Sequence, residues 1–256
     1  MEIRLEHKDC LEFLKNIETG TVDMVFADPP FNVGMKYKGY NDKVQNYREW
    51  CAEWIGECFR VLKNSGTFYM MTIDRYLEWK MPLMAKHGVF VNLIKWRNVS
   101  AVHDKRRFWI STQPIMVYGK TDAYSFNTYA QTRPADQVMQ SWNKERSKNV
   151  KGQLLDYWDD IPFVYAGAIK HKEALLESGT NRKAHCCQMP EMLAGRAMLF
   201  STNEGDTVLD PFSGSGTTAV VCYKLKRRFI GCEISEEYFA LGLRRLDQIK
   251  QNLFNG

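Results

Sequence analysis

The feature that most constrains the fold of this chain is a series of short apolar runs separated by segments with helical spacing. The runs are rich in Val, Ile, Phe and Tyr and are bounded by turn or charged residues, which is typical of buried strands. They cover residues 21–27, 67–72, 90–96, 113–119, 206–210 and 227–234. Amphipathic spacing predicts helices over residues 46–62, 188–200 and 236–253. This alternation predicts an α/β fold with a mostly parallel sheet and helices on both faces.

Residues 120–154 interrupt this pattern. The stretch is polar, rich in Asn, Gln, Thr and Arg, and has no sustained apolar period. A long loop without structure of its own is unusual inside a compact domain unless it is functional. We therefore interpret residues 120–154 as an insertion that reaches towards a ligand, within one domain built from residues 1–119 and 155–256.

The composition fits one sizeable domain of 256 residues, of which 45% are hydrophobic and 25% charged. No run approaches the roughly 18 apolar residues of a membrane span, and the first residues are charged, so we expect a cytoplasmic protein. Seven cysteines without a CxxC pair indicate neither a disulfide framework nor a zinc ribbon. His185, Cys186 and Cys187 supply fewer ligands than zinc usually takes, so we expect idle thiols and no metal.

The net charge of +5 is compatible with nucleic-acid binding, but many unrelated proteins share such a charge. Its distribution is more informative, because Lys and Arg gather in residues 95–107 and 144–151. Each cluster is either a solvated face or a set of phosphate contacts, and charge alone does not separate the two interpretations.

The sequence ADPPFN at residues 27–32 directly follows an apolar run. In an open parallel sheet, ligands bind beyond the carboxyl ends of the strands, where this loop falls. Two prolines fix the backbone and supply no N–H donors, so the loop is stiff and rich in acceptors. Such a loop can hold both hydrogens of an amino group while Phe31 stacks on the ring that bears it. The alternative is a proline turn at a strand end with Asp28 as a cap.

The sequence DPFSGSGTT at residues 210–218 follows another apolar run and precedes a helical segment. Gly214 and Gly216 allow a close backbone approach, and the N-terminus of a helix attracts anionic groups. Glu233 ends the next predicted strand, about 20 residues on, where an acidic residue commonly accepts hydrogen bonds from ribose hydroxyls. Because neither GxGxxG nor GK[ST] is present, a nucleoside cofactor with a carboxylate is favoured over a dinucleotide or a nucleoside triphosphate.

With ADPPFN near its start and DPFSGSGTT near its end, the chain resembles the β-group S-adenosylmethionine-dependent DNA amino-methyltransferases. In that family the DPP[YF] motif precedes the target-recognition region and the FxGxG motif comes last. Further similar segments are HKDCLEFL (7–14), LKNSGT (62–67), IKW (94–96), RRF (106–108) and AHCCQMP (184–190). The sequence departs from the family where Lys8 replaces a Gly, where a His-Glu pair after RRF is missing, and where Cys186, Cys187 and Met189 replace Pro, Thr and Lys.

The resemblance implies a circularly permuted class I methyltransferase with a Rossmann-like, seven-stranded, mostly parallel sheet and residues 120–154 as a target-recognition insertion. It implies methyl transfer from S-adenosylmethionine to the N6 amino group of adenine, in a base flipped out of double-stranded DNA. Asp-Pro-Pro usually accompanies adenine in this family and Ser-Pro-Pro usually accompanies the N4 position of cytosine. The alternatives are an N4-cytosine enzyme, an RNA or protein-amide methyltransferase, or a non-catalytic DNA-binding protein. Because the family often dimerises, we expect a homodimer, in a bacterial cell or a phage-infected one.

The resemblance also assigns roles to individual residues. Asp28 and the Pro29 carbonyl would accept hydrogen bonds from the amino group, and Phe31 would stack on the flipped base. The implied catalytic residues are Asp28, Pro29, Pro30 and Phe31. The implied cofactor-binding residues are Asp9, Asp28, His185, Asp210, Phe212, Gly214, Gly216, Thr217, Thr218 and Glu233, with helix capping as the alternative role of Asp9. Apart from the resemblance, we expect DNA contacts at Lys95, Arg97, Lys105, Arg106, Arg107 and Arg133. Phosphates would be held by the first five and by the Lys and Arg residues of 143–151, and base edges would be read by Asn127, Gln131, Arg133, Gln137, Gln140 and Asn143.

Overall fold

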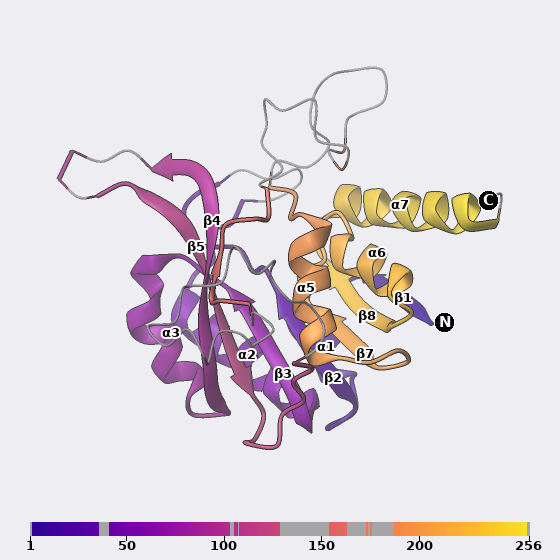
Figure 1. The fold of residues 1–256 in the computed structure, drawn as a ribbon, viewed down its shortest axis with the longest axis horizontal. Coiled ribbons are helices and arrows are strands. Elements are labelled where there is room, and N and C mark those ends of the chain that lie inside the picture. The colour runs from indigo at the N-terminus through magenta and orange to yellow at the C-terminus, as the bar shows by residue number, and fades with distance from the viewer. Residues whose placement is uncertain are drawn as a thin grey trace, which may run out of the picture.

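The computed structural model describes residues 2–35, 41–102, 105–106, 108–128, 154–162, 173, 175 and 187–254. Within this part of the chain, one eight-stranded sheet has the strand order β1-β8-β7-β2-β3-β5-β4-β6 (Figure 1). The strands are β1 (Ile3–His7), β2 (Val22–Ala27), β3 (Leu62–Met71), β4 (Val89–Val102), β5 (Ile110–Gly119), β6 (Tyr157–Trp158), β7 (Thr207–Asp210) and β8 (Arg228–Glu233). Neighbouring strands are parallel except at β5, which runs antiparallel to both β3 and β4.

The mostly parallel α/β sheet predicted from the alternation of strands and helices is confirmed, and each of the six predicted strands is present. The residue pattern did not indicate β1 or β6. The first is an edge strand in which charged Arg4 and Glu6 interrupt the apolar residues. The second has two residues and pairs with Lys95 and Trp96 of β4, so it is too short to give a pattern. It brings the sheet to eight strands where the family resemblance implied seven.

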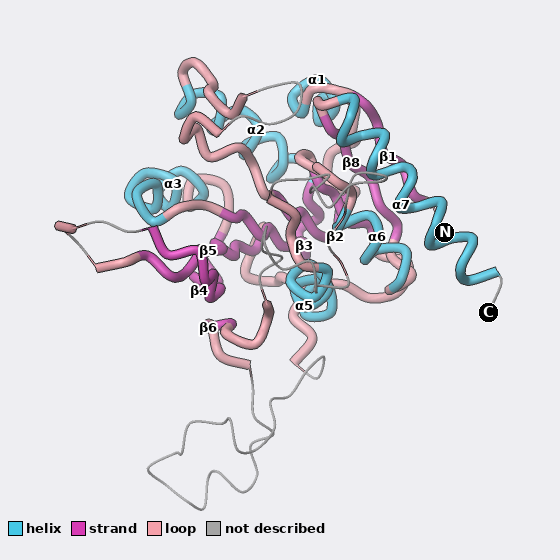
Figure 2. Tube along the Cα trace, turned by 90° about the horizontal axis from the view of Figure 1, so that it is seen from above, coloured by secondary structure: helices cyan, strands magenta, loops and turns pink. Residues whose placement is uncertain are grey.

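Helices cover both faces of the sheet (Figure 2). On one face lie α1 (Cys10–Lys15), α2 (Tyr47–Val61) and α3 (Leu77–Met84), and on the other lie α5 (Glu191–Ser201), α6 (Thr217–Lys224) and α7 (Glu236–Phe254). Each layer has its own apolar cluster, one around Trp54 and Phe68 and the other around Met198 and Leu246. The sheet is therefore buried on both sides, and its strand ends are left to form a site.

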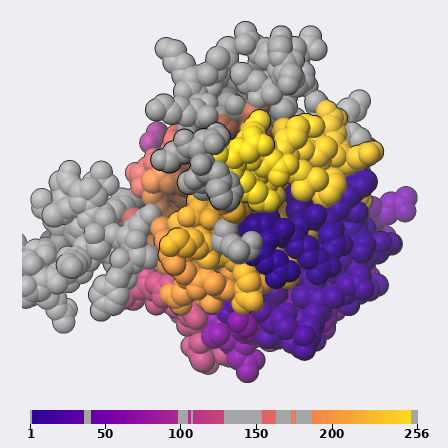
Figure 3. Space-filling model, turned by 90° about the vertical axis from the view of Figure 1, so that its right-hand side faces the viewer, coloured from indigo at the N-terminus to yellow at the C-terminus, as the bar shows by residue number. Residues whose placement is uncertain are grey.

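The N-terminal strand and the C-terminal helix lie side by side on one face of the molecule (Figure 3). On another side, β4 and β5 form a hairpin that extends beyond the rest of the sheet (Figure 1). Phe108, close to the turn of this hairpin, is 98% exposed. No helix in the described residues is long and apolar enough to cross a membrane.

The beginning of the predicted insertion packs against the body of the domain. The amide nitrogen of the Asn127 side chain donates to the carbonyls of Leu199 and Thr202, each at 3.1 Å, at the end of α5. This end of α5 leads into the start of β7, so Asn127 lies at the edge of the sheet opposite to Asp28. The prediction that Asn127 reads a base edge is therefore wrong, because its side chain is an anchor on the far edge. Gln131, Arg133, Gln137, Gln140 and Asn143 lie outside the described residues.

Candidate active site

Three carboxylates stand at the carboxyl ends of three neighbouring strands. Glu233 ends β8, Asp210 ends β7, and Asp28 follows β2, and these strands are adjacent in the sheet. Asp210 and Glu233 are buried, with 3% and 5% of their surfaces exposed. The sequence placed all three at strand ends, and the parallel pairing brings them to one edge of the sheet.

Burial and mutual repulsion make these carboxyl groups weak acids. Burial raises the pKa of Asp28 to about 7, with Asp210 adding to the rise and Lys80 opposing it. Burial also raises the pKa of Asp210 to about 7, against hydrogen bonds from Thr218 and the Phe212 N–H, while Glu233 adds to the rise. A cation placed between these groups would favour their ionised forms. The edge is therefore suited to a positively charged ligand.

The loop that carries Asp28 is held from behind by side chains. The Tyr47 hydroxyl donates to the Pro30 carbonyl at 2.7 Å, and the Asn32 side-chain oxygen accepts from the Val44 N–H at 3.0 Å. Asn32 itself has a positive φ of 53°, which Asn tolerates better than most residues. It therefore acts both as a turn residue and as a brace of the loop. Phe31 is partly buried against the apolar cluster around Met198.

Asp42 is a second anchor of this loop that sequence reasoning missed. Its side chain is 1% exposed and accepts hydrogen bonds from the N–H groups of Val33 at 2.9 Å, Gly34 at 2.6 Å and Met35 at 2.8 Å. Nothing in its local sequence distinguishes it from a surface Asp, because the partners lie seven to nine residues away. One carboxylate thus fixes the chain directly after Phe31.

We expect Asp42→Ala to lower the kcat/KM of the methyl transfer that the family resemblance implies by about 10-fold or more, because three N–H groups lose a charged acceptor worth roughly 1.5–3 kcal/mol. Asp42→Asn keeps one carbonyl oxygen and should lose less. Steady-state kinetics and a thermal melt of each variant check this. Equal kinetic losses in Asp42→Asn and Asp42→Ala, or unchanged kinetics in both, would contradict the assignment.

The glycine-rich loop between β7 and α6 needs its glycines for backbone geometry. Gly214 and Gly216 have φ values of 51° and 76°, in the region that favours glycine. A Cβ on Gly216 would lie 3.0 Å from the Cα of Gly242 in α7, so the loop passes directly over that helix. Glu233 accepts from the N–H groups of Gly214 and Ser235, both at 2.8 Å. Glu233, which is predicted to bind the ribose hydroxyls, therefore also fixes the conformation of the loop.

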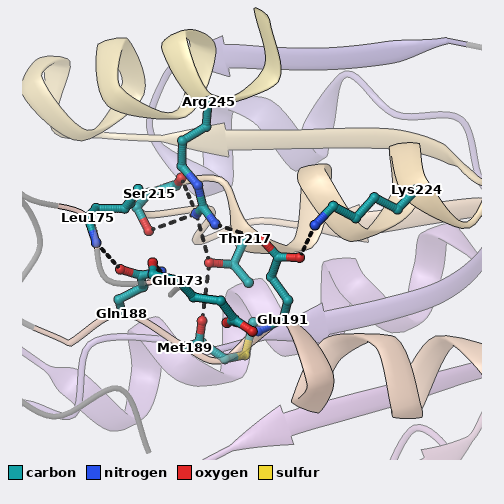
Figure 4. Close-up of polar contacts among 9 residues, drawn as sticks. All are labelled: Glu173, Leu175, Gln188, Met189, Glu191, Ser215, Thr217, Lys224 and Arg245. Atoms are coloured by element: carbon teal, nitrogen blue, oxygen red, sulfur yellow. Dashed lines mark hydrogen bonds and ion pairs between the residues drawn. The ribbon is translucent and has the colours of Figure 1, made fainter. Parts of the chain in front are cut away.

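Arg245 ties this loop to two other segments (Figure 4). From α7, its buried guanidinium donates to the Ser215 carbonyl at 2.9 Å and to Thr217 Oγ1 at 3.0 Å, and it approaches Glu191 Oε1 at 3.4 Å. Thr217 Oγ1 in turn donates to the Met189 carbonyl at 3.3 Å, just before α5. The glycine loop, the start of α5 and α7 thus meet at one guanidinium, which no sequence motif indicated.

Several predicted cofactor residues are engaged within the protein. Asp9 caps α1 through one carboxylate oxygen, which accepts from the Leu11 N–H at 2.8 Å and the Glu12 N–H at 3.3 Å, so the capping role left open above is present. The Thr218 hydroxyl donates to Asp210 at 2.6 Å. The Phe212 ring packs on Trp54, with ring centroids 5.0 Å apart. Contacts of these residues with a cofactor stay predictions, and His185 lies outside the described residues.

The predicted phosphate contacts that the structure describes fall into two groups. Lys95 forms an ion pair with Asp74 at 2.6 Å, so part of its charge is neutralised. Arg97, Lys105 and Arg106 are exposed on the β4–β5 hairpin. Arg107, Arg133 and residues 143–151 lie outside the described residues. The hairpin therefore presents positive charge together with the exposed ring of Phe108, whereas Lys95 serves first as an internal partner.

Most of the described cysteines belong to the core. Cys10, Cys51, Cys58, Cys222 and Cys232 are buried and form no disulfide, whereas Cys187 is partly exposed, with its Sγ 3.4 Å from the Met35 sulfur. Burial raises the pKa of the Cys58 thiol well above its ordinary value, which makes it a poor nucleophile at neutral pH. The five buried thiols are therefore core residues rather than reactive groups.

Comparison with known proteins identifies the family. A family model described as DNA methylase matches residues 22–244. The type II methyltransferase M.HpaI of Haemophilus parainfluenzae is 32% identical over all of this chain and 76% of its own length. The DNA adenine methyltransferase YhdJ of Escherichia coli (strain K12) is 34% identical over 94% of this chain and 81% of its own.

Solved structures of low sequence identity share the fold. The cytosine-N4-specific PvuII DNA methyltransferase superposes with a TM-score of 0.70 at 18% identity, over 96% of this chain and 86% of its own. The complex of M1.HpyAVI with S-adenosylmethionine gives a TM-score of 0.64 at 22% identity, over 95% and 98% of the two chains. The fold, the motif order and these relatives together show that the chain belongs to the N6-adenine/N4-cytosine family of DNA methyltransferases.

Proposed function

We propose that this protein transfers a methyl group from S-adenosylmethionine to the N6 amino group of adenine in double-stranded DNA. The observation that carries the proposal is the Asp28-Pro29-Pro30-Phe31 loop, which leaves β2 beside Asp210 and the glycine loop. The acceptor-rich loop suits an amino group, and the DNA adenine methyltransferase YhdJ, at 34% identity, supports adenine. The cytosine-N4-specific PvuII enzyme shares the fold, so N4-cytosine is the alternative acceptor.

The residues at this edge fit S-adenosylmethionine. The glycine loop bends with positive φ at Gly214 and Gly216, which lets backbone approach a ligand. Asp28 and Asp210, each with a raised pKa, favour a cation nearby. When bound, S-adenosylmethionine supplies a methyl group on a positively charged sulfur, and the amino nitrogen takes it as that nitrogen gives up one proton. Glu233 is placed to hold the ribose hydroxyls.

The catalytic loop would act on the amino group by orienting it. The Asp28 carboxylate and the Pro29 carbonyl would accept its two hydrogens, which turns the nitrogen lone pair out of conjugation with the ring. Fixed acceptors aimed at developing positive charge lower the barrier without reorganising. Phe31 would stack on the base after it leaves the duplex, a contact worth ~1–3 kcal/mol. Because the Pro30 carbonyl is held by Tyr47, the loop is preorganised for this task.

The β4–β5 hairpin would contact the duplex. Arg97, Lys105 and Arg106 are exposed on it and suit phosphates, whose contribution falls as salt rises. The hairpin lies next to β3 in the sheet and adjoins the edge that carries the catalytic loop. The homodimer and the insertion over residues 120–154 as the target-recognition region stay predictions.

Methyl transfer from labelled S-adenosylmethionine to unmethylated genomic DNA, followed by digestion to nucleosides, tests the proposal. We expect the label in N6-methyladenine. Label in N4-methylcytosine would overturn the choice of base and keep the reaction. Folded protein that binds the cofactor and labels no DNA would overturn the proposal as a whole.

A further inference from the structure

A lysine is completely buried beside the catalytic loop. Lys80, in α3, has 0% of its surface exposed, although lysine is almost never fully buried unless its charge has a partner. Among the described residues, the hydrogen-bond partner of its ammonium is the Tyr47 hydroxyl rather than a carboxylate. The ammonium also lies 5.3 Å from the ring centre of Tyr47, 5.5 Å from that of Tyr76 and 5.4 Å from that of Trp79. The rings of Tyr76 and Trp79 stabilise a cation in this position, whereas Tyr47 meets the ammonium with its hydroxyl.

Lys80 is linked to the catalytic loop by one directed hydrogen-bond chain. Lys80 Nζ lies 3.2 Å from the Tyr47 hydroxyl oxygen, and the Tyr47 hydroxyl donates to the Pro30 carbonyl at 2.7 Å. An ammonium group can only donate, so the tyrosine oxygen accepts from Lys80. The hydroxyl hydrogen is then left for Pro30. The direction of the chain is thus fixed at both ends, because the Pro30 carbonyl can only accept, and the positive charge of Lys80 prevents its nitrogen from competing for the Tyr47 hydrogen.

The same charge acts on the catalytic carboxylate. Lys80 lowers the pKa of Asp28, against burial and Asp210, which raise it. Burial lowers the pKa of Lys80 to about 8, with Cys51 and Asp28 opposing. The ammonium is therefore mostly protonated at neutral pH, when Asp28 is titrating. Within the described part of the chain, Lys80 and Asp28 are thus faced by the titratable groups of Cys51, Asp210, Tyr47 and Tyr76.

We propose that Lys80 is a positioning residue of the catalytic loop, whose buried ammonium orients the Tyr47 hydroxyl towards the Pro30 carbonyl and serves as the internal counter-charge of Asp28. The inference rests on the proposed function, because it gives the loop after β2 its electrostatic support. Lys80 does not reach the reacting atoms in this account. It acts through its hydrogen bond to Tyr47 and through the effect of its positive charge on Asp28.

Lys80→Met tests the proposal, since it keeps an unbranched side chain and removes the charge and the donor. We expect kcat for methyl transfer to fall about 10-fold or more, with the KM for S-adenosylmethionine little changed. In the cofactor-free protein, the ¹³C resonance of the Asp28 carboxyl should titrate at higher pH than in the wild type, because a nearby positive charge is gone. Lys86→Met, at an exposed lysine just beyond α3, is the matched control and should change neither quantity.

Two more variants separate the contributions. Tyr47→Phe keeps Lys80 and the ring, so it should lower kcat without moving the Asp28 titration upwards. Lys80→Arg keeps the charge and should titrate close to the wild type, which a merely space-filling role of Lys80 would not require. If Lys80→Met does not fold, Lys80→Gln replaces it in the same comparison.

An Asp28 titration that is the same in the wild type and in the folded uncharged variant would overturn the proposal, as would unchanged kcat in both Tyr47→Phe and Lys80→Met. The titration needs neither DNA nor cofactor. The titration therefore tests the role of Lys80 even if the wild type methylates no DNA. A wild type that methylates no DNA would overturn the proposed function instead.

Discussion

Replacing Asp28 with Asn is expected to lower kcat for methyl transfer by about 100- to 1,000-fold, the usual loss when one preorganised electrostatic group of an active site is removed. Asn keeps the shape of the side chain, but its charge is gone and its amide nitrogen repels the hydrogens of the amino group. The binding of S-adenosylmethionine should weaken much less than kcat falls, because Asp28 is only one of the implied cofactor contacts, and the glycine loop and Glu233 are untouched. Single-turnover transfer measures the first quantity and isothermal titration calorimetry the second.

The pH dependence of the same pair of proteins sharpens this prediction. Burial raises the pKa of Asp28 to about 7, and only the ionised carboxylate accepts hydrogen bonds without a competing proton. The kcat/KM of the wild type for S-adenosylmethionine, which reports the cofactor-free enzyme, should therefore rise with pH through about 7 and fall away below it, whereas the bound sulfonium should move the acid limb of kcat to lower pH. Because Asp28 and Asp210 interact, the acid limb of kcat/KM belongs to the pair rather than to one residue. In Asp28→Asn the remaining activity should not show the same decrease towards low pH.

Asp122→Asn is the matched control for the loss of one carboxylate. Asp122 is exposed and follows β5, at the edge of the sheet opposite to Asp28. Its replacement should leave both the rate and the acid limb in place. If Asp28→Asn retained more than a tenth of the wild-type kcat, Asp28 would not be the acceptor that the reaction depends on.

The strand ends of the site were predictable from the sequence because each depends on a local pattern. Asp28, Asp210 and Glu233 follow apolar runs, and parallel pairing then determines that they share an edge. Gly214 and Gly216 were predictable for the same reason, since a turn that requires positive φ favours glycine. The order of the two motifs along the chain then indicated the family.

The supporting residues were not predictable, because their roles depend on distant partners. Three residues support the catalytic loop: Asp42 from the segment before α2, Tyr47 from α2 and Lys80 from α3. In the sequence they look like ordinary turn and helix residues. A fully buried lysine is also the opposite of what helical spacing suggests for a charged residue. The prediction for Asn127 was wrong for a related reason. Nothing in its polar surroundings indicated that its side-chain amide would donate to a carbonyl at the end of α5.

Arg245→Met is expected to lower the free energy of unfolding by about 3 kcal/mol, the lower end of the range for removing one partner of a buried ion pair. The Ser215 carbonyl and the Thr217 hydroxyl lose a charged donor, and Met fills much of the space without replacing it. The lower end of the range applies because Glu191 keeps Lys224 as an ion-pair partner. Urea denaturation followed by circular dichroism measures this change.

The loss of Arg245 should reach the cofactor site as well as the global stability. The guanidinium is the contact at which α7, the glycine loop and the residues before α5 meet (Figure 4), so its removal frees a loop that has to be ordered when ligand binds. We expect the Kd for S-adenosylmethionine to rise about 10-fold, the effect of one lost hydrogen bond to a charged group. Arg244→Met is the matched control, because Arg244 is the exposed neighbour on the same helix and should leave both stability and Kd unchanged. Equal behaviour of the two variants would show that the helix, and not the guanidinium, holds the glycine loop.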